Sequence, residues 1–185
     1  MKFTLLATSA LLASLLVANA QAADDHKAAP IKEAVAVIGP TKASNSQTAG
    51  VITLKQEHGY VLVSGEVSGL TPGKHGFHIH MFGDLRSADG MSVGGHYNPE
   101  GHDHGGPESK AHHIGDLGNI EADDSGVAKV NVKAEKADLH MLLGRSLVVH
   151  AKADDLKTQP AGDSGPRIGI GVIGLAEVKP ATAAQ

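Results

Sequence analysis

The sequence predicts an all-β domain: an eight-stranded antiparallel Greek-key β-barrel, or immunoglobulin-like sandwich, with two long functional loops. Short runs rich in valine and isoleucine alternate with polar residues at a period of two, which is the pattern of half-buried strands. Turn-forming residues separate these runs, and almost no segment has a helical period. The chain also contains 23 glycines, which suit the tight turns of such a fold.

The expected strands follow one another at short intervals. They cover residues 33–38, 50–56, 60–67, 76–82, 117–122, 127–134, 146–152 and 168–178. Two connections are too long for a minimal barrel, residues 83–115 and residues 153–167, and the first is rich in Gly, His, Asp and Pro. Long structureless loops in a compact domain usually carry function, so we expect the site beside these two connections.

Residues 1–22 have the parts of a secretory signal peptide. A basic start at Lys2 precedes an apolar run to about Val17, and small residues then permit cleavage after Ala22 or Ala20. The run is too short to span a membrane, and no cysteine follows it to carry a lipid anchor. We therefore expect a single domain over residues 23–185, secreted across the inner membrane into the bacterial periplasm without a membrane anchor.

Composition excludes several classes of partner and bond. The formal net charge is −4 and aromatic residues make up 3% of the chain, so neither a basic footprint nor a base-stacking surface for nucleic acid is expected. The chain has no cysteine, so it cannot form the disulfides that are common in exported proteins. Histidine, with 12 copies, is then the main candidate ligand for a transition metal.

Two groups of residues have the spacing of metal ligands. His78 and His80 share one face of a strand, and His150 ends another apolar strand, which together suit copper or zinc. His104, His113 and Asp116 lie in or beside the glycine-rich loop; three such ligands and one more group make a closed tetrahedral zinc site. His96 lies between the groups, and an imidazole that is deprotonated at both nitrogens can bind one metal through each.

The remaining histidines are interpreted without a metal. A lone histidine is more often a surface or core residue than a ligand. His75 is expected to be a structural hydrogen-bonding residue. The others assigned to ordinary surface or core positions are His26, His58, His102, His112 and His140.

The segments HGFHIHMFGD, GGHYNPEGHDHGGP, HHIGDLGNI and SLVVHAKADD, followed by GPRIGIGVIG, resemble the copper/zinc superoxide dismutases. The resemblance runs from about Ala34 to Val178. It implies one copper and one zinc ion per subunit, and superoxide as the substrate. His104 rather than His102 matches the family's His-Gly-Gly-Pro motif, and a histidine three residues before Asp116 matches the next ligand. The implied copper ligands are His78, His80, His96 and His150, and the implied zinc ligands are His96, His104, His113 and Asp116.

The resemblance also implies roles around the metals. Asp154 matches an aspartate that bonds one ligand of each metal, and Arg167 matches an arginine that attracts and positions the anion. Two superoxide anions then give dioxygen and hydrogen peroxide as copper alternates between two oxidation states, and His96 returns a proton to the developing peroxide. The protein is acidic overall, so attraction of the substrate must be local, through Arg167 and lysines such as Lys152 and Lys157.

The sequence departs from the family at two places. The family's disulfide is missing, and the matching positions are near Gly90-Met91 and at Ile170. We therefore expect the order of the first long loop to depend on zinc. Met81 replaces an acidic residue, and strand alternation favours packing over copper ligation for it.

Two other functions and two oligomeric states stay open on the sequence alone. A non-catalytic periplasmic copper/zinc-binding protein on the same fold is the main alternative, although such a carrier needs neither Arg167 nor a bridging histidine. A zinc hydrolase is a weaker alternative, since a hydrolase needs an open coordination position on zinc and His96 would fill that position. Members of the family occur as monomers and as dimers, so a homodimer is one of the two expected states.

Overall fold

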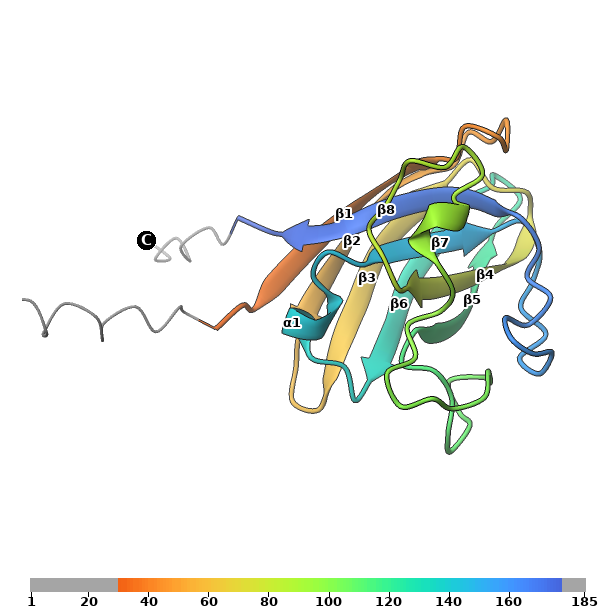
Figure 1. Ribbon diagram of the computed structural model, residues 1–185. Helices are drawn as coiled ribbons and strands as arrows, with labels where there is room; N and C mark the ends of the chain where they lie inside the picture. The colour runs from red at the N-terminus through yellow and green to blue at the C-terminus, as the bar shows by residue number, and fades with distance from the viewer. Residues whose placement is uncertain (1–29, 178–185) are drawn as a thin grey trace, which may run out of the picture. The chain divides into compact units, whose positions relative to one another are not determined.

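The computed structural model describes residues 30–177, and residues 33–175 form a closed barrel of eight antiparallel strands (Figure 1). Two short helices accompany the barrel, the 3-10 turn η1 (Met91–Val93) and α1 (Leu139–Leu142). The strands are β1 (Glu33–Pro40), β2 (Ala49–Gln56), β3 (Tyr60–Ser68), β4 (Gly73–His80), β5 (Asp116–Ala122), β6 (Ala128–Glu135), β7 (Ser146–His150) and β8 (Arg167–Leu175).

The strand order around the barrel is β1-β2-β3-β6-β5-β4-β7-β8. Because β3 pairs with β6 and β4 pairs with β7, the chain crosses between non-sequential neighbours as in a Greek key. The predicted all-β class and the eight-stranded antiparallel barrel are thus confirmed. The expected signal peptide, residues 1–22, lies outside the described residues. Within residues 30–177, no helix has the length and apolar character needed to cross a membrane.

Strand alternation builds the core of the barrel. On β1, Ala34, Ala36 and Ile38 are buried inside, whereas Val37 points outward and is 68% exposed. Val37 pairs across the sheet with Val51, which is also exposed. The inward positions of the other strands complete one continuous cluster, and each large aliphatic side chain buried there contributes roughly 1.5–3 kcal/mol.

Strand β4 is buried on both faces, unlike β1. Phe77 and Ile79 point into the barrel core, and His78 and His80 point to the opposite face. That second face is covered by the two long connections, residues 81–115 and 151–166, which make hydrogen bonds to both histidine rings. The imidazoles are therefore shielded from water without entering the apolar core.

The first long connection returns to the end of β4 and pairs with it. The amide of Tyr97 donates to the carbonyl of Ile79 over 2.8 Å, and the amide of Ile79 donates to the carbonyl of Gly115 over 2.9 Å. A side chain at Gly115 would collide with the carbonyl oxygen of Ile79, so only glycine permits this approach. The pairing places His96 opposite His80 as an isolated β-bridge.

Most strand boundaries lie within a few residues of the sequence prediction, and two of the differences affect the strands that carry the histidines. Strand β4 begins at Gly73, because Gly73 (φ 112°) leaves the Pro72-Gly73 turn and already pairs with Ala122. Strand β7 ends at His150, because the register shifts between Val149 and His150. After this shift, Val149 remains in the core and the His150 ring lies beside the ring of His80.

Candidate metal centre

Seven side chains converge outside the barrel wall at the end of β4. They form two groups, His78, His80, His96 and His150 in one, and His96, His104, His113 and Asp116 in the other. Within each group the potential ligand atoms lie within 4.8 Å of one another, and all seven residues are buried. The structure thus brings together every residue that the sequence analysis expected to bind a metal, with His96 common to both groups.

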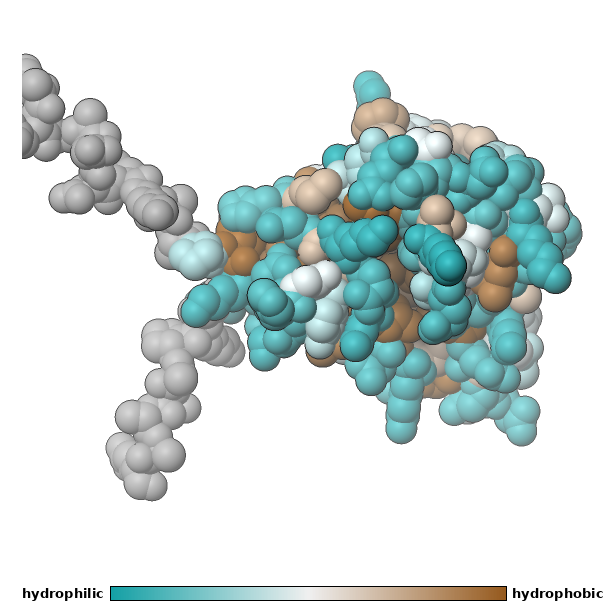
Figure 2. All heavy atoms as spheres, turned by 90° about the horizontal axis from the view of Figure 1, so that it is seen from below, coloured by the Kyte–Doolittle hydropathy of each residue, from teal (hydrophilic) through white to brown (hydrophobic). Residues whose placement is uncertain are grey.

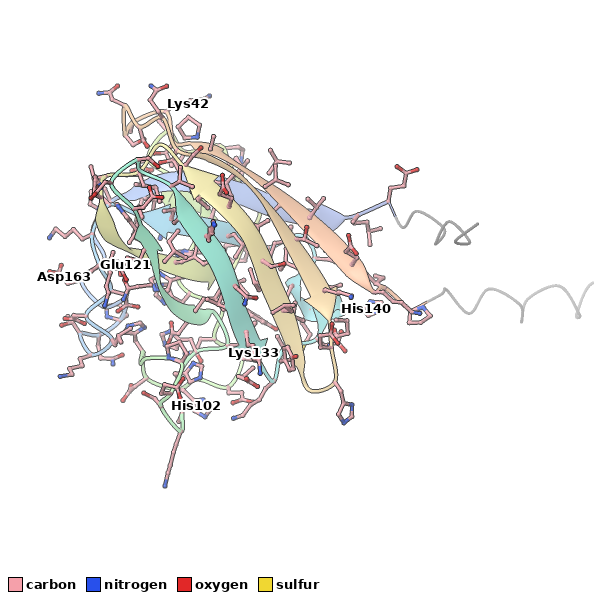
Figure 3. All side chains as sticks on the ribbon, turned by 180° about the vertical axis from the view of Figure 1, so that it is seen from behind. Lys42, His102, Glu121, Lys133, His140 and Asp163 are labelled. Atoms are coloured by element: carbon pink, nitrogen blue, oxygen red, sulfur yellow. The ribbon has the colours of Figure 1, made fainter. Side chains whose placement is uncertain are left out.

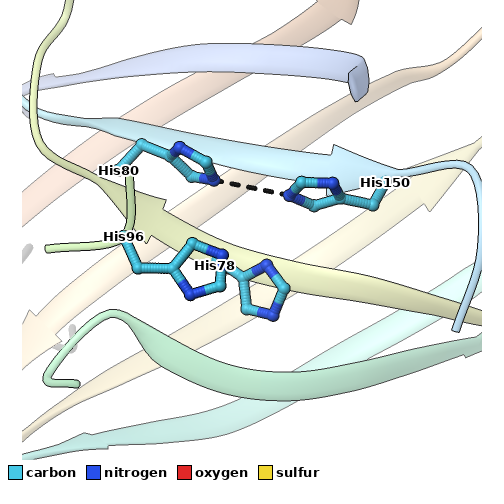
Figure 4. Close-up of side chains that lie close together, drawn as sticks. All are labelled: His78, His80, His96 and His150. Atoms are coloured by element: carbon cyan, nitrogen blue, oxygen red, sulfur yellow. Dashed lines mark hydrogen bonds between the residues drawn. The ribbon is translucent and has the colours of Figure 1, made fainter. Parts of the chain in front are cut away.

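The rings of His80 and His150 are oriented by the backbone. Nδ1 of His80 bonds to the carbonyl of Gly94 over 2.8 Å, and Nδ1 of His150 bonds to that of Gly165 over 3.0 Å. Carbonyls only accept, so each Nδ1 donates and each Nε2 of the neutral ring carries a lone pair. The two Nε2 atoms face each other at 3.4 Å (Figure 4). Two facing lone pairs repel each other, and a cation bound by both nitrogens would relieve that repulsion.

Two further nitrogens in this group are buried without any hydrogen-bond partner. They are Nδ1 of His78 and Nε2 of His96, from rings whose centroids are 3.9 Å apart (Figure 4). An unsatisfied buried polar group costs roughly 1–3 kcal/mol, so its presence calls for an explanation. A metal ion supplies one, and a set of four imidazole nitrogens suits Cu(II).

The second group converges on one oxygen of Asp116. Its Oδ1 lies 2.7 Å from Nδ1 of His96, 3.0 Å from Nδ1 of His104 and 3.1 Å from Nδ1 of His113. Four ligands about 2.0–2.1 Å from a tetrahedral zinc ion lie about 3.3 Å from one another, close to this spacing. The approach of His104 is not aligned as a hydrogen bond, and its buried Nδ1 has no other partner. The donor set therefore fits zinc.

Burial and neighbouring carboxylates set the charges of these groups. Burial lowers the pKa of His78 to about 4 and that of His150 to about 3, so both rings are neutral at pH 7 and can ligate a metal. Burial also acts to lower the pKa of His104, but the neighbouring carboxylates of Asp116 and Asp154 outweigh it and raise the pKa to about 9. Metal binding at His104 must therefore displace a proton.

Asp154 connects the two groups. Its Oδ2 accepts from Nε2 of His78 over 2.8 Å, and its Oδ1 accepts from Nε2 of His104 over 3.0 Å. Although burial raises its pKa, these hydrogen bonds hold the pKa of Asp154 well below its usual range, so the carboxylate is ionised. Hydrogen bonds to the outer nitrogens fix the orientation and tautomer of both rings. The structure thus places Asp154 where the sequence analysis expected it.

Arg167 borders a cavity of about 420 Å³ that is also lined by His80 and His150. Its guanidinium donates to the carbonyls of Gly90 (2.5 Å) and Gly94 (2.6 Å), so it also tethers the first long connection. Asp89 contributes a carboxylate to the same cavity.

The two lysines that were expected to aid Arg167 lie elsewhere. Lys152 and Lys157 are not among the residues that line this cavity, and Lys152 Nζ lies 3.7 Å from the carboxylate of Asp163. Among the described residues, Arg167 is thus the only cationic side chain lining the cavity. In Figure 3, Asp163 lies at the edge of the molecule, which is consistent with a surface ion pair.

The histidines assigned to ordinary positions stay outside both groups. His102 and His140 lie at the periphery, on the first connection and on α1 (Figure 3), and His26 lies outside the described residues. His75 is buried, and its ring bonds to the carbonyls of His150 (2.8 Å) and Thr71 (2.9 Å). It therefore holds the backbone of β7 without facing a metal site.

Three supporting residues were missed by the sequence analysis. Asn119 bonds the backbone of Asp154, and Gln159 bonds the backbone of His104. Arg145 stacks 3.6 Å above the Tyr97 ring and donates to the carbonyl of Met81, the residue after His80. Met81 itself packs against the barrel core, as expected. No sequence pattern marks the three, because each acts across a tertiary contact.

Comparisons with known proteins agree with this geometry. The family model described as copper/zinc superoxide dismutase (SODC) matches residues 48–173. The extracellular superoxide dismutase [Cu-Zn] of Onchocerca volvulus is 42% identical over 161 residues, which cover 80% of this chain and 78% of that protein. A solved structure, the crystal structure analysis of the clock protein EA4, matches with a TM-score of 0.71 and 36% identity. That match covers 82% of this chain and 99% of the other.

Proposed function

This chain belongs to the copper/zinc superoxide dismutase family, and from that premise we propose which of its residues carry the activity. The enzyme is an oxidoreductase that converts two superoxide anions into dioxygen and hydrogen peroxide, with copper and zinc as cofactors. Copper, when bound, supplies the redox couple that accepts an electron from one superoxide and returns it to the next.

We assign copper to Nδ1 of His78 and to Nε2 of His80, His96 and His150. Zinc is assigned to Asp116 and to Nδ1 of His96, His104 and His113. The observation that carries both assignments is the position of the His96 ring. Its Nδ1 lies 2.7 Å from Asp116 in the zinc group, while its Nε2 is buried without a partner in the copper group. A bridging imidazolate accounts for both nitrogens.

His96 is also assigned the proton transfer. Its Nε2 is the nitrogen of the bridge on the side of His80 and His150, the two ligands that line the cavity. When that nitrogen is free it can hold a proton and deliver it to peroxide, which is general acid catalysis by a positioned imidazole. Asp116 and the zinc ligands fix the other side of the ring, so the proton is delivered from a defined position.

Arg167 is assigned the binding of the anion. It is half-buried, it lines the cavity with His80 and His150, and two backbone carbonyls hold its guanidinium in place. A fixed positive charge in a partly desolvated cavity attracts and orients a small anion. Asp89 lies in the same cavity and weakens the attraction, so the local field depends strongly on Arg167.

The bridge can be tested by magnetic coupling. With Co(II) in the zinc site and Cu(II) in the copper site, a shared imidazolate couples the two unpaired-spin systems and suppresses the Cu(II) electron paramagnetic resonance signal. His96→Ala should restore the signal of an isolated Cu(II) ion. An unsuppressed Cu(II) signal in the doubly loaded native protein would contradict the assignment of His96.

We also propose that the mature domain acts after export, as residues 23–185 in the bacterial periplasm. The N-terminal leader supports export, and so does the relative described as extracellular. N-terminal sequencing of the periplasmic fraction tests this, with a start at Gln21 or Ala23 as the expected result. An uncleaved chain in the cytoplasm would contradict it.

A homodimer without nucleic acid or a membrane anchor is the proposed state of the mature protein. The exposed side chains of Val37 and Val51, which pair across β1 and β2, support an association between copies. The face in Figure 2 shows mostly hydrophilic side chains with apolar ones between them. Light scattering of the purified protein tests the dimer, and the mass of a monomer at micromolar concentration would exclude it.

A further inference from the structure

The side-chain amide of Gln159 makes two hydrogen bonds to the backbone of His104, an assigned zinc ligand. The amide N–H of His104 donates to Oε1 of Gln159 over 2.8 Å, and Nε2 of Gln159 donates to the carbonyl of His104 over 2.8 Å. The two residues lie 55 positions apart and belong to different long connections. The amide thus acts like a partner strand for a single residue and satisfies both of its backbone groups.

The same segment also holds the His104 ring. Asp154, five residues before Gln159, accepts from Nε2 of His104 over 3.0 Å. With the backbone fixed by Gln159 and the outer nitrogen fixed by Asp154, rotation of the ring is restricted. The remaining nitrogen, Nδ1, is then directed at Asp116, where it is buried without a hydrogen-bond partner.

The segment is anchored to the barrel by an equivalent contact. The amide of Asp154 donates to Oδ1 of Asn119 over 2.7 Å, and Nδ2 of Asn119 donates to the carbonyl of Asp154 over 2.9 Å. Asn119 belongs to β5, a rigid element of the barrel. Asn119 therefore connects β5 to Asp154, and Gln159 connects the segment after Asp154 to His104. Both connections form without a disulfide.

We propose that Gln159 is a positioning residue of the zinc site, which acts through His104 and raises the affinity of the protein for zinc. The inference rests on the assignment of His104 as a zinc ligand. The Gln159 residue is exposed overall, so its replacement leaves the barrel core intact. Its role is therefore separable from folding.

The test compares matched glutamine variants of the full chain loaded with copper and zinc. Gln159→Met keeps the length of the side chain and removes both hydrogen bonds to His104, together with the 3.2 Å bond from Nε2 to the carbonyl of Lys157. Gln56→Met is the control, since Gln56 likewise accepts from the amide of Leu139 (2.7 Å) and donates to the carbonyl of Glu57 (2.9 Å), away from the metal site. Zinc affinity is measured by competition with a chromophoric chelator, and site geometry by the visible absorption of Co(II) at the zinc site.

We expect Gln159→Met to weaken zinc binding roughly 10-fold and to alter the Co(II) spectrum, with Gln56→Met changing neither. Gln159→Ala should reproduce the effect. A zinc affinity within about twofold of the native value in both Gln159 variants would overturn the proposal, as would an equal loss in Gln56→Met. His104→Ala distinguishes the ligand assignment from the role of Gln159. Undiminished zinc binding in His104→Ala would refute the assignment of His104 as a ligand. Lost zinc binding in His104→Ala, with native affinity in Gln159→Met, would refute only the role of Gln159.

Discussion

The side chain of Ile170 lies directly against Gly90, and a Cβ atom at Gly90 would collide with Cδ1 of Ile170. These two positions match those of the family's disulfide, which this chain lacks because it has no cysteine. Ile170 is buried with Val93 and Val148 in a small cluster separate from the main core. Where the resemblance implies a disulfide between the metal loop and the last strand, this chain packs an isoleucine over a glycine.

We predict strong coupling between Gly90 and Ile170. Gly90→Ala should destabilise the protein because the new methyl group meets Ile170 and because Gly90 has a positive φ of 76°. Ile170→Ala removes the opposing methyl groups, so the double variant should lose less stability than the sum of the single variants. A coupling energy of about 0.5–3 kcal/mol is expected in denaturant unfolding. Strictly additive losses in the free energy of unfolding would show that the two residues are not coupled and would contradict the prediction.

Zinc should control the order of the first long connection. Besides its backbone pairing with the end of β4, the segment of residues 84–115 is anchored by Arg167, by Gln159 and by ligands that converge on Asp116. Without zinc, the buried His104 and His113 lose their common partner, and we expect faster hydrogen exchange over residues 84–115. Exchange measured with and without zinc tests this, with β1 and β2 as internal references. Equal protection in the two states would contradict the prediction.

Asp154→Asn should weaken metal binding. Asparagine keeps the shape of the side chain but has a single accepting oxygen, so the rings of His78 and His104 can no longer both donate to it. Loss of such an outer contact typically costs about 10–100-fold in metal affinity. The control is Asp155→Asn, whose exposed carboxylate bonds only Thr158 and the amide of Lys157 nearby. Equal metal affinities in Asp154→Asn and Asp155→Asn would contradict the role of Asp154 in orienting the metal ligands.

Gly162 should be intolerant of any side chain. A Cβ atom there would collide with Oδ1 of Asp154 and lie 2.8 Å from Nε2 of His104. Gly162→Ala should therefore displace Asp154 and reduce zinc retention during dialysis against a chelator. Gly59→Ala is the control, since Gly59 also has a positive φ but has open space around it. The same zinc loss in both variants would attribute the effect to backbone strain alone.

The sequence predicted the barrel because alternation along each strand reports directly which face is buried. It also predicted which residues meet at the site, because His78 and His80 share a face and the ligand motifs are specific. The bulge at Val149 and His150 was not predicted, because register depends on the neighbouring strand.

Contacts between the two long connections could not be predicted from the sequence either. An exposed glutamine such as Gln159 carries no pattern that says which backbone it reaches. For the same reason the sequence did not indicate that Lys152, which was expected to help attract the anion, lies near Asp163 on its own loop.

The most direct test of the seven-residue site is superoxide consumption by protein that contains one copper and one zinc ion per chain. We predict rapid dismutation by the native protein, first order in protein concentration, and a fall to nearly the protein-free rate in His150→Ala at matched metal content. His150 supplies one of the four copper nitrogens and lines the cavity, so its loss removes both a ligand and part of the substrate site. Full metal occupancy without dismutation in the native protein, or undiminished dismutation in His150→Ala, would contradict the account.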